Sequence, residues 1–212
     1  LAQITDEYKS RTKSSYRLHK EAKEVFPGGD TRNVPFFKPY PSFMELGKGC
    51  RLWDVDGNEI IDFQNNYTSL IHGHAHPGIV EAVQEQIAKG SVYSAPFEKQ
   101  TELAEIICSR VPSVDKIRFT NSGTEATMHA VRGARAYTGR TKIVKIEGGY
   151  HGSSDTFEAS VEPDMDKVGD IENPIAVADS KGVPKETVEL VIIVPFNNIE
   201  VTRRLIEKNH DD

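Results

Sequence analysis

Hydrophobic side chains recur at helical spacing near the start of the chain. Over residues 5–26, Leu18, Ala22 and Val25 follow the i, i+4, i+7 spacing that places apolar side chains on one face of a helix. The Pro-Gly-Gly sequence at 27–29 favours a turn and should end this helix. The pattern therefore predicts one helix with an apolar stripe.

Strand-like alternation and two further helices are expected next. Residues 51–63 (RLWDVDGNEIIDF) predict a β-hairpin, because the Asp-Gly pair at 56–57 tolerates the positive φ of a tight turn. A proline begins and a glycine ends the helix predicted over 77–90. A second helix is expected over about 97–111, where a following proline stops it.

Strands and helices alternate from residue 116 onward. Short strands are expected at 116–120 and 142–146, with a helix at 124–138 between them. The uninterrupted apolar run LVIIV at 190–194 is typical of a strand buried on both faces of a parallel sheet, and Asn198 should cap a last helix. The alternation predicts an α/β fold with ligands at the carboxyl ends of its strands.

The segment 155–188 breaks this alternation with prolines, glycines and acidic residues. Connections of this length are often lids or binding loops, and a plain surface excursion is an equally open interpretation. We expect a small N-terminal α+β segment at 1–75 and the first part of a larger, mainly parallel-sheet domain at 76–212. Because that sheet needs more strands to cover its central one, the chain is expected to stop in mid-domain.

Composition narrows the possible partners and location. The net charge is −6 and the basic residues are scattered, which argues against nucleic acid as a partner. No apolar stretch approaches the length of a membrane span, and the first residues lack the order of a signal peptide. Cys50 and Cys108 are too few for a disulfide framework. We therefore expect a cytoplasmic protein with no membrane partner.

Candidate chemistry is concentrated in the sequence FTNSGTEA at 119–126, which leaves a predicted strand and enters a helix. Gly123 lets the backbone approach an anion, Ser122 and Thr124 bring hydroxyls, and the first helical turn has free N–H groups. The sequence lacks the Gly-Lys-Ser/Thr of a Walker loop and the G-x-G-x-x-G of a dinucleotide site. It predicts a phosphate-binding turn, with an ordinary capping box as the alternative.

A second candidate, EGGYHG at 147–152, follows the next predicted strand. Its glycines present Tyr150 and His151 at a strand's carboxyl end, beside the expected phosphate site. A flat aromatic ring there can stack on a planar cofactor. The alternative interpretation is a glycine-rich turn with an incidental aromatic residue.

Taken together, these segments resemble class III aminotransferases, and within that group the glutamate-1-semialdehyde aminomutases and the β-amino acid aminotransferases. Further matching motifs are WDVDG at 53–57, GHAHP at 73–77 and RAYTGR at 135–140. The resemblance covers nearly the whole chain in a consistent order, and so is more specific than any single motif.

The resemblance implies a pyridoxal-5'-phosphate (PLP) enzyme of fold type I that works as a homodimer with its active site at the interface. It assigns cofactor binding to Ser122, Gly123, Thr124, Tyr150 and His151, with Glu125 behind them. The family also needs a lysine for the Schiff base and an aspartate for the pyridine nitrogen, and both are expected beyond residue 212. No catalytic residue is therefore assigned in this chain, and Lys142 and Lys145 are interpreted as structural.

Two residues bear on the substrate. Arg32 matches the position of a substrate-binding arginine in the β-amino acid aminotransferases, whereas the aminomutases have theirs a few residues later. Its guanidinium could hold a carboxylate by two parallel hydrogen bonds, or it is a solvated surface charge. Tyr67 stands where the aminomutases have tryptophan, and is the second candidate for substrate binding.

The alternating histidines His72, His74 and His76 share a face if their segment is extended, which suggests a metal site. The competing interpretation is a polar loop that leads into the next helix. Similar proteins carry such a segment without needing a metal, so no metal is expected.

The leading hypothesis is PLP-dependent amino-group transfer between an amino acid, including a β-amino acid, and a keto acid. The second is the aminomutase reaction, an isomerisation. A third, of another class, is a cofactor-binding or assembly fragment that has no activity by itself.

Overall fold

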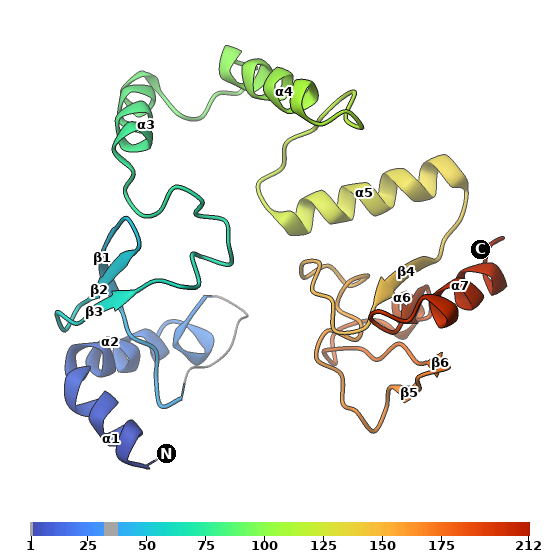
Figure 1. Cartoon of the computed structure of the whole chain (residues 1–212), viewed down its shortest axis with the longest axis horizontal. Coiled ribbons are helices and arrows are strands. Elements are labelled where there is room, and N and C mark those ends of the chain that lie inside the picture. Colours follow the sequence, from blue (N-terminus) through green and yellow to red (C-terminus); the bar gives the residue numbers. More distant parts are fainter. Residues whose placement is uncertain (1, 32–37) are drawn as a thin grey trace. The chain divides into compact units, whose positions relative to one another are not determined.

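The computed structural model describes residues 2–31 and 38–212, which form two compact units, Leu1–Phe97 and Glu98–Asp212 (Figure 1). Each unit has its own strands and its own buried side chains. The domain boundary expected after residue 75 is a different division: it marks the start of the expected cofactor-binding domain, and it stays a prediction.

Unit 1 combines helices with a small antiparallel sheet. Its elements are α1 (Ala2–Arg11), α2 (Lys13–Lys23), the 3-10 turn η1 (Pro27–Gly29), β1 (Met44–Lys48), β2 (Arg51–Asp54), β3 (Glu59–Ile61) and α3 (Pro77–Lys89). The strands lie in the order β1-β2-β3 (Figure 1). The hairpin predicted at 51–63 is confirmed, with Gly57 at φ 81° in its turn.

Thr12 interrupts the helix expected over 5–26, so the prediction of a single helix is wrong. The backbone at Thr12 has φ −127°, outside the helical range. Its hydroxyl donates to the carbonyl of Tyr8 at 2.6 Å and lies 3.1 Å from the hydroxyl of Tyr40. Local side-chain hydrogen bonds of this kind offer the backbone an alternative to continued helix.

The buried face of α2 is also different from the expected apolar stripe. Leu18 and Ala22 are half-buried and Val25 is 72% exposed, whereas Ser15 and His19 are buried. Polar side chains can be buried where partners satisfy them. The Ser15 hydroxyl is hydrogen-bonded to Asp56 in the hairpin turn. The His19 ring is stacked on a buried tyrosine, but its buried Nδ1 has no hydrogen-bond partner among the described residues.

Unit 2 contains the predicted strand–helix alternation. Its elements are α4 (Glu98–Arg110), α5 (Gly123–Thr138), β4 (Ile143–Ile146), β5 (Gly169–Asp170), β6 (Asn173–Pro174), α6 (Lys185–Val188), β7 (Val191–Val194) and α7 (Ile199–Lys208). The helices expected over 97–111 and 124–138 are confirmed here as α4 and α5, and the helix expected over 77–90 is confirmed as α3 of unit 1. The strand expected at 116–120 is not formed, because a strand needs a neighbour and no described segment pairs with it.

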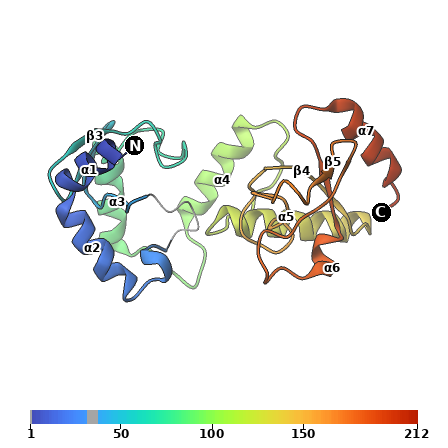
Figure 2. The same cartoon turned by 90° about the horizontal axis from the view of Figure 1, so that it is seen from below.

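Strand β7 is covered on both faces, as predicted for residues 190–194, whereas Val144 and Ile146 of β4 remain exposed. One face packs Ile143, Val191 and Ile193 against Ala159 and Ala176. The other packs Ile192 and Val194 against Val201 and Leu205 of α7, whose first turn is capped by Asn198. Figure 2 shows α7, in red, at the outer side of this unit.

The segment 155–188 supplies one of those two covers. Its residues Ala159 and Ser160 are fully buried, and Ala159 forms a β-bridge with Ala178. In Figure 2 the segment, in orange, winds through the centre of unit 2. Part of this excursion is therefore core, which neither of the two sequence interpretations included.

Candidate functional site

The turn that begins α5 is built by its own side chains. Ser122 is the N-cap, and its hydroxyl accepts a hydrogen bond from the N–H of Glu125 at 3.1 Å. The Glu125 carboxylate in turn accepts from the N–H of Asn121 at 2.6 Å. The capping box considered as an alternative is thus formed in a shifted version, because Glu125 accepts from the residue before the cap and so acts on the backbone behind the turn.

The same turn keeps donors free for an anion. The N–H groups of Gly123 and Thr124 belong to the first helical turn, where the helix itself supplies no acceptor. A side chain added at Gly123 would meet open space. The hydroxyls of Ser122 and Thr124 accept hydrogen bonds, which leaves their own hydrogens available. The positive end of the helix dipole adds to this electrostatic preference for an anion.

The EGGYHG loop is attached to this helix end by two hydrogen bonds. The N–H of Ser153 donates to the hydroxyl of Thr124 at 3.1 Å, and the hydroxyl of Thr127 donates to the carbonyl of His151 at 2.9 Å. Gly152, at φ 94°, lies so close that a Cβ would stand 2.6 Å from the Thr124 hydroxyl oxygen. The structure therefore brings the two predicted segments together.

The two side chains that the loop presents differ in their surroundings. Tyr150 is 60% exposed, and within the described residues its ring makes no aromatic contact. The His151 ring contacts Phe157 edge-on, with 5.6 Å between ring centroids. Tyr150 is thus free to stack on a planar ligand, while His151 is already oriented by a neighbour.

Of the two substrate candidates, Tyr67 is in unit 1 and Arg32 lies outside the described residues. Tyr67 is 52% exposed and sits at φ 55° in a run of left-handed residues from Asn65 to Thr68. This conformation is costly for residues other than glycine and needs support from its surroundings.

Asp62 provides that support. Its carboxylate accepts from the N–H groups of Asn65 at 2.8 Å and Gln64 at 3.0 Å, and it lies 2.7 Å from Nε2 of His74. The hydrogen bond from Asn65, followed by that from His74, lowers the pKa of Asp62 below its ordinary value. Asp62 thereby fixes the start of the turn that carries Tyr67.

The histidine segment does not converge on one point. His74 is engaged with Asp62, while the rings of His72 and His76 contact each other edge-on at 5.5 Å. Among the residues that the structure describes, no three histidine, cysteine, aspartate or glutamate side chains form a group able to hold a metal ion. No helix in the described ranges, 2–31 and 38–212, has the length and apolarity needed to cross a membrane.

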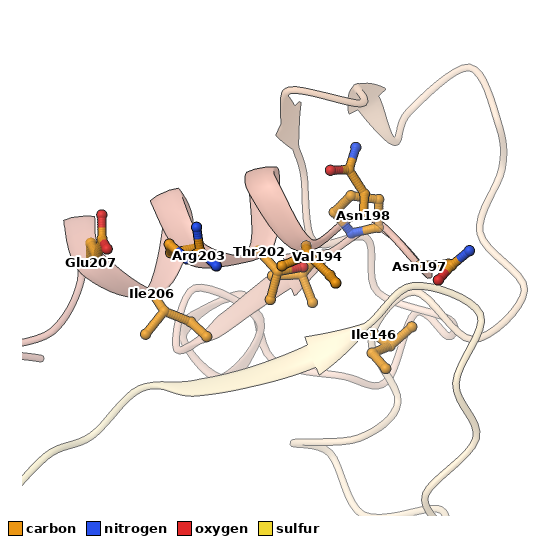
Figure 3. Close-up of a pocket in the computed structure, with 10 residues that line it drawn as sticks. Ile146, Val194, Asn197, Asn198, Thr202, Arg203, Ile206 and Glu207 are labelled. Atoms are coloured by element: carbon orange, nitrogen blue, oxygen red, sulfur yellow. The ribbon is translucent and has the colours of Figure 1, made fainter.

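A separate hollow of about 480 Å³ lies between the carboxyl ends of β4 and β7 and the helix α7 (Figure 3). Ile146, Val194 and Ile206 form its apolar wall, and Thr202 and Arg203 are among its polar residues. The candidate cofactor residues all lie in the described chain and none of them lines this hollow. It is thus distinct from the site at the start of α5.

Sequence reasoning did not single out Thr127, Ser153 or Phe157, which orient the loop. Thr127 could have been found, because it lies three residues after Thr124 and thus on the same side of the helix. The tight approach of Gly152 was implicit in the flanking glycines. Phe157 offers no local pattern, because its contact with His151 depends on the path of the excursion.

A model of the class-III aminotransferases matches residues 37–188 of the chain. Glutamate-1-semialdehyde 2,1-aminomutase from Methanothermobacter thermautotrophicus is 48% identical over 198 residues, which are 93% of this chain and 45% of that protein. The chain thus spans a little under half the length of this curated relative.

Solved structures have a similar fold. A transaminase with PLP bound is 41% identical, with a TM-score of 0.86 over 95% of this chain and 46% of its own. The β-phenylalanine aminotransferase from Variovorax paradoxus is 30% identical, with a TM-score of 0.80 over 99% of this chain and 44% of its own. These likenesses extend over both units of the chain.

Proposed function

Because this chain belongs to the class-III aminotransferase family, we propose that the turn at 122–124 and the loop at 147–153 form the phosphate and ring portions of a PLP site. The observation that carries the proposal is the pair of hydrogen bonds that attaches the Tyr150 loop to the first turns of α5. The free donors of that helix turn fit a phosphate, and the exposed ring fits a planar cofactor.

Each residue has a distinct task in this proposal. Ser122, Gly123 and Thr124 bind the phosphate through hydroxyl and backbone N–H groups, and Glu125 keeps the turn in shape. Tyr150 covers one face of the pyridine ring, with His151 beside it. When bound, PLP withdraws electrons from the substrate carbon, which is the chemistry that amino-group transfer requires.

The rest of the catalytic machinery is proposed to lie outside residues 1–212. The lysine that carries PLP and the aspartate that pairs with its ring nitrogen belong to family motifs not found here. The residues at 76–212 would then be the first part of the cofactor-binding domain. We further propose a cytoplasmic homodimer with its active site at the interface, and an inactive protein if the chain stands alone.

The reaction of the complete gene product is proposed to be transfer of an amino group from an amino acid, including a β-amino acid, to a keto acid. The likeness to the β-phenylalanine aminotransferase and the presence of Arg32 and Tyr67 support it. The aminomutase reaction is the second candidate, favoured by the 48% identity to a glutamate-1-semialdehyde aminomutase.

Replacing Thr124 tests the phosphate site. In the complete gene product, Thr124→Val should weaken PLP binding about ten-fold or more, because a hydrogen bond to a charged group contributes roughly 1.5–3 kcal/mol. Binding of pyridoxal, which lacks the phosphate, should fall less, because it loses only what the bond between Thr124 and Ser153 contributes through the loop. Thr124→Ser keeps the hydroxyl and serves as the control in both titrations. Equal losses for the two ligands would argue against a phosphate contact.

Arg32 separates the two reactions. Arg32→Lys in the complete gene product should lower kcat/KM for carboxylated substrates about ten- to a hundred-fold, because lysine cannot reproduce the planar fork of the guanidinium. Simple amines should be much less affected. The unmodified protein should also transfer an amino group from a β-amino acid to a keto acid. Isomerisation of glutamate 1-semialdehyde without an acceptor, at a rate unchanged by Arg32→Lys, would instead establish the aminomutase.

A further inference from the structure

Ser160 is a buried junction behind the candidate cofactor site. It is 0% exposed and adopts φ 53°, a left-handed conformation that is unfavourable for serine. Its N–H donates to the carbonyl of Val177 at 2.7 Å, and its hydroxyl accepts from the N–H of Val177 at 3.0 Å. These two bonds hold the Ser160 carbonyl in one orientation.

That carbonyl accepts two donors from the strand end that leads to Tyr150. The N–H of Gly148 donates to it at 2.8 Å, and the ammonium of Lys145 donates at 3.2 Å. The preceding N–H, that of Glu147, makes the last bond to β7, at 2.9 Å from the carbonyl of Val194. The Ser160 carbonyl therefore fixes the loop at the residue where it leaves the sheet.

Lys145 is an unusual residue for its position. It is only 3% exposed and pairs with Ile193, on the sheet face where Ile193 packs against Ala159. Burial of the amine lowers the pKa of Lys145, with a smaller opposing effect from Asp179 and Glu147. A hydrophobic side chain would fill such a position at less cost, because a buried cation is poorly solvated.

The far end of the loop is fixed separately, by Thr124 and Thr127 on α5. We propose that Lys145 and Ser160 are positioning residues that hold the near end of the Tyr150 loop. The inference rests on the proposed PLP site: with both ends fixed, the ring of Tyr150 is kept where it can cover the cofactor. Asp179 supports the junction, since its carboxylate accepts from the N–H groups of the two residues after Ser160.

This role makes stability and cofactor binding respond in opposite ways to Lys145→Met. Methionine removes the poorly solvated charge and fills the same space, so the melting temperature of the complete gene product without PLP should stay the same or rise. The Ser160 carbonyl loses one of its two donors and keeps only the N–H of Gly148, so amide exchange over 148–153 should become faster while β4 and β7 stay protected. The dissociation constant for PLP should increase on the order of ten-fold.

Two further variants complete the test. Lys142→Met is the matched control: Lys142 belongs to the same segment but is bonded to Asn209 and Asp212, so exchange over 148–153 and PLP affinity should match the unmodified protein. Ser160→Ala removes the hydroxyl that orients the carbonyl, so it should also speed exchange over 148–153 and weaken PLP binding. It tests the same junction independently if Lys145→Met does not fold.

The outcomes separate this inference from the function on which it rests. Failure of the unmodified protein to bind PLP would overturn the proposed function, and the cofactor-free exchange data would still report on the loop. Exchange and affinity unchanged in both Lys145→Met and Ser160→Ala would overturn the positioning role. So would a lowered melting temperature with faster exchange throughout unit 2, since Lys145 would then serve the fold in general.

Discussion

Tyr150 has an exposed side chain on a backbone that is fixed on both sides. Its ring is mostly exposed, yet the backbone on either side is fixed by hydrogen bonds from Gly148 and Ser153. Because the backbone is already fixed, only the freedom of the side chain itself is lost when a flat partner stacks on the ring. The side chain therefore contributes little to the core and is available for binding.

Tyr150→Ala should accordingly weaken PLP retention in the complete gene product and leave the melting temperature without PLP nearly unchanged. Aromatic stacking contributes roughly 0.5–1.5 kcal/mol beyond area burial, so the affinity should fall about two- to ten-fold from stacking alone. Tyr150→Phe, which keeps the ring, is the control and should bind as the unmodified protein does. A clear loss of melting temperature with unchanged affinity would assign Tyr150 to the core instead.

The turn at 65–68 is an element whose backbone is held by one side chain. Its left-handed residues depend on Asp62, whose carboxylate holds the first N–H groups of the turn and contacts His74. Because the folded pKa of Asp62 is below its ordinary value of 3.8, its contribution is complete above that value. It is lost as the pH falls from about 3.8 through the folded pKa.

Amide protection factors over residues 64–70 should therefore drop in that acidic range in the complete gene product. Asp62→Asn cannot titrate and should show weaker protection that no longer depends on pH there. Asp164→Asn, which alters another carboxyl with a lowered pKa but in unit 2, should leave the profile of the turn as it was. Protection that is independent of pH in the unmodified protein would contradict this role of Asp62.

Elements with strong local rules were predictable from sequence, and those that depend on distant partners were not. The hairpin at 51–63 and the cap of α5 follow from residues within a few positions of each other. The break at Thr12 depends partly on Tyr40, 28 residues away. Likewise, the candidate cofactor turn was recognisable from its motif, whereas the junction at Ser160 requires two segments whose meeting no local pattern encodes.

At the scale of the whole molecule, the chain gathers the predicted phosphate turn and the predicted ring-stacking loop in one unit. The lysine that would carry the cofactor is proposed to lie outside residues 1–212. Lys145 has the lowered pKa that makes an amine reactive, but it is almost fully buried and donates to the Ser160 carbonyl. An amine in that state is not accessible to an aldehyde.

The 212-residue chain alone, treated with PLP and then with borohydride, should therefore give no single stoichiometric reduced adduct by mass spectrometry. Exposed lysines should be modified only weakly and at many positions. The complete gene product should instead give one dominant adduct outside residues 1–212. One dominant adduct within those residues would show that this chain carries its own cofactor lysine, and would overturn the proposal that this lysine lies outside residues 1–212. If the adduct were on Lys145, it would also overturn the positioning role of that residue.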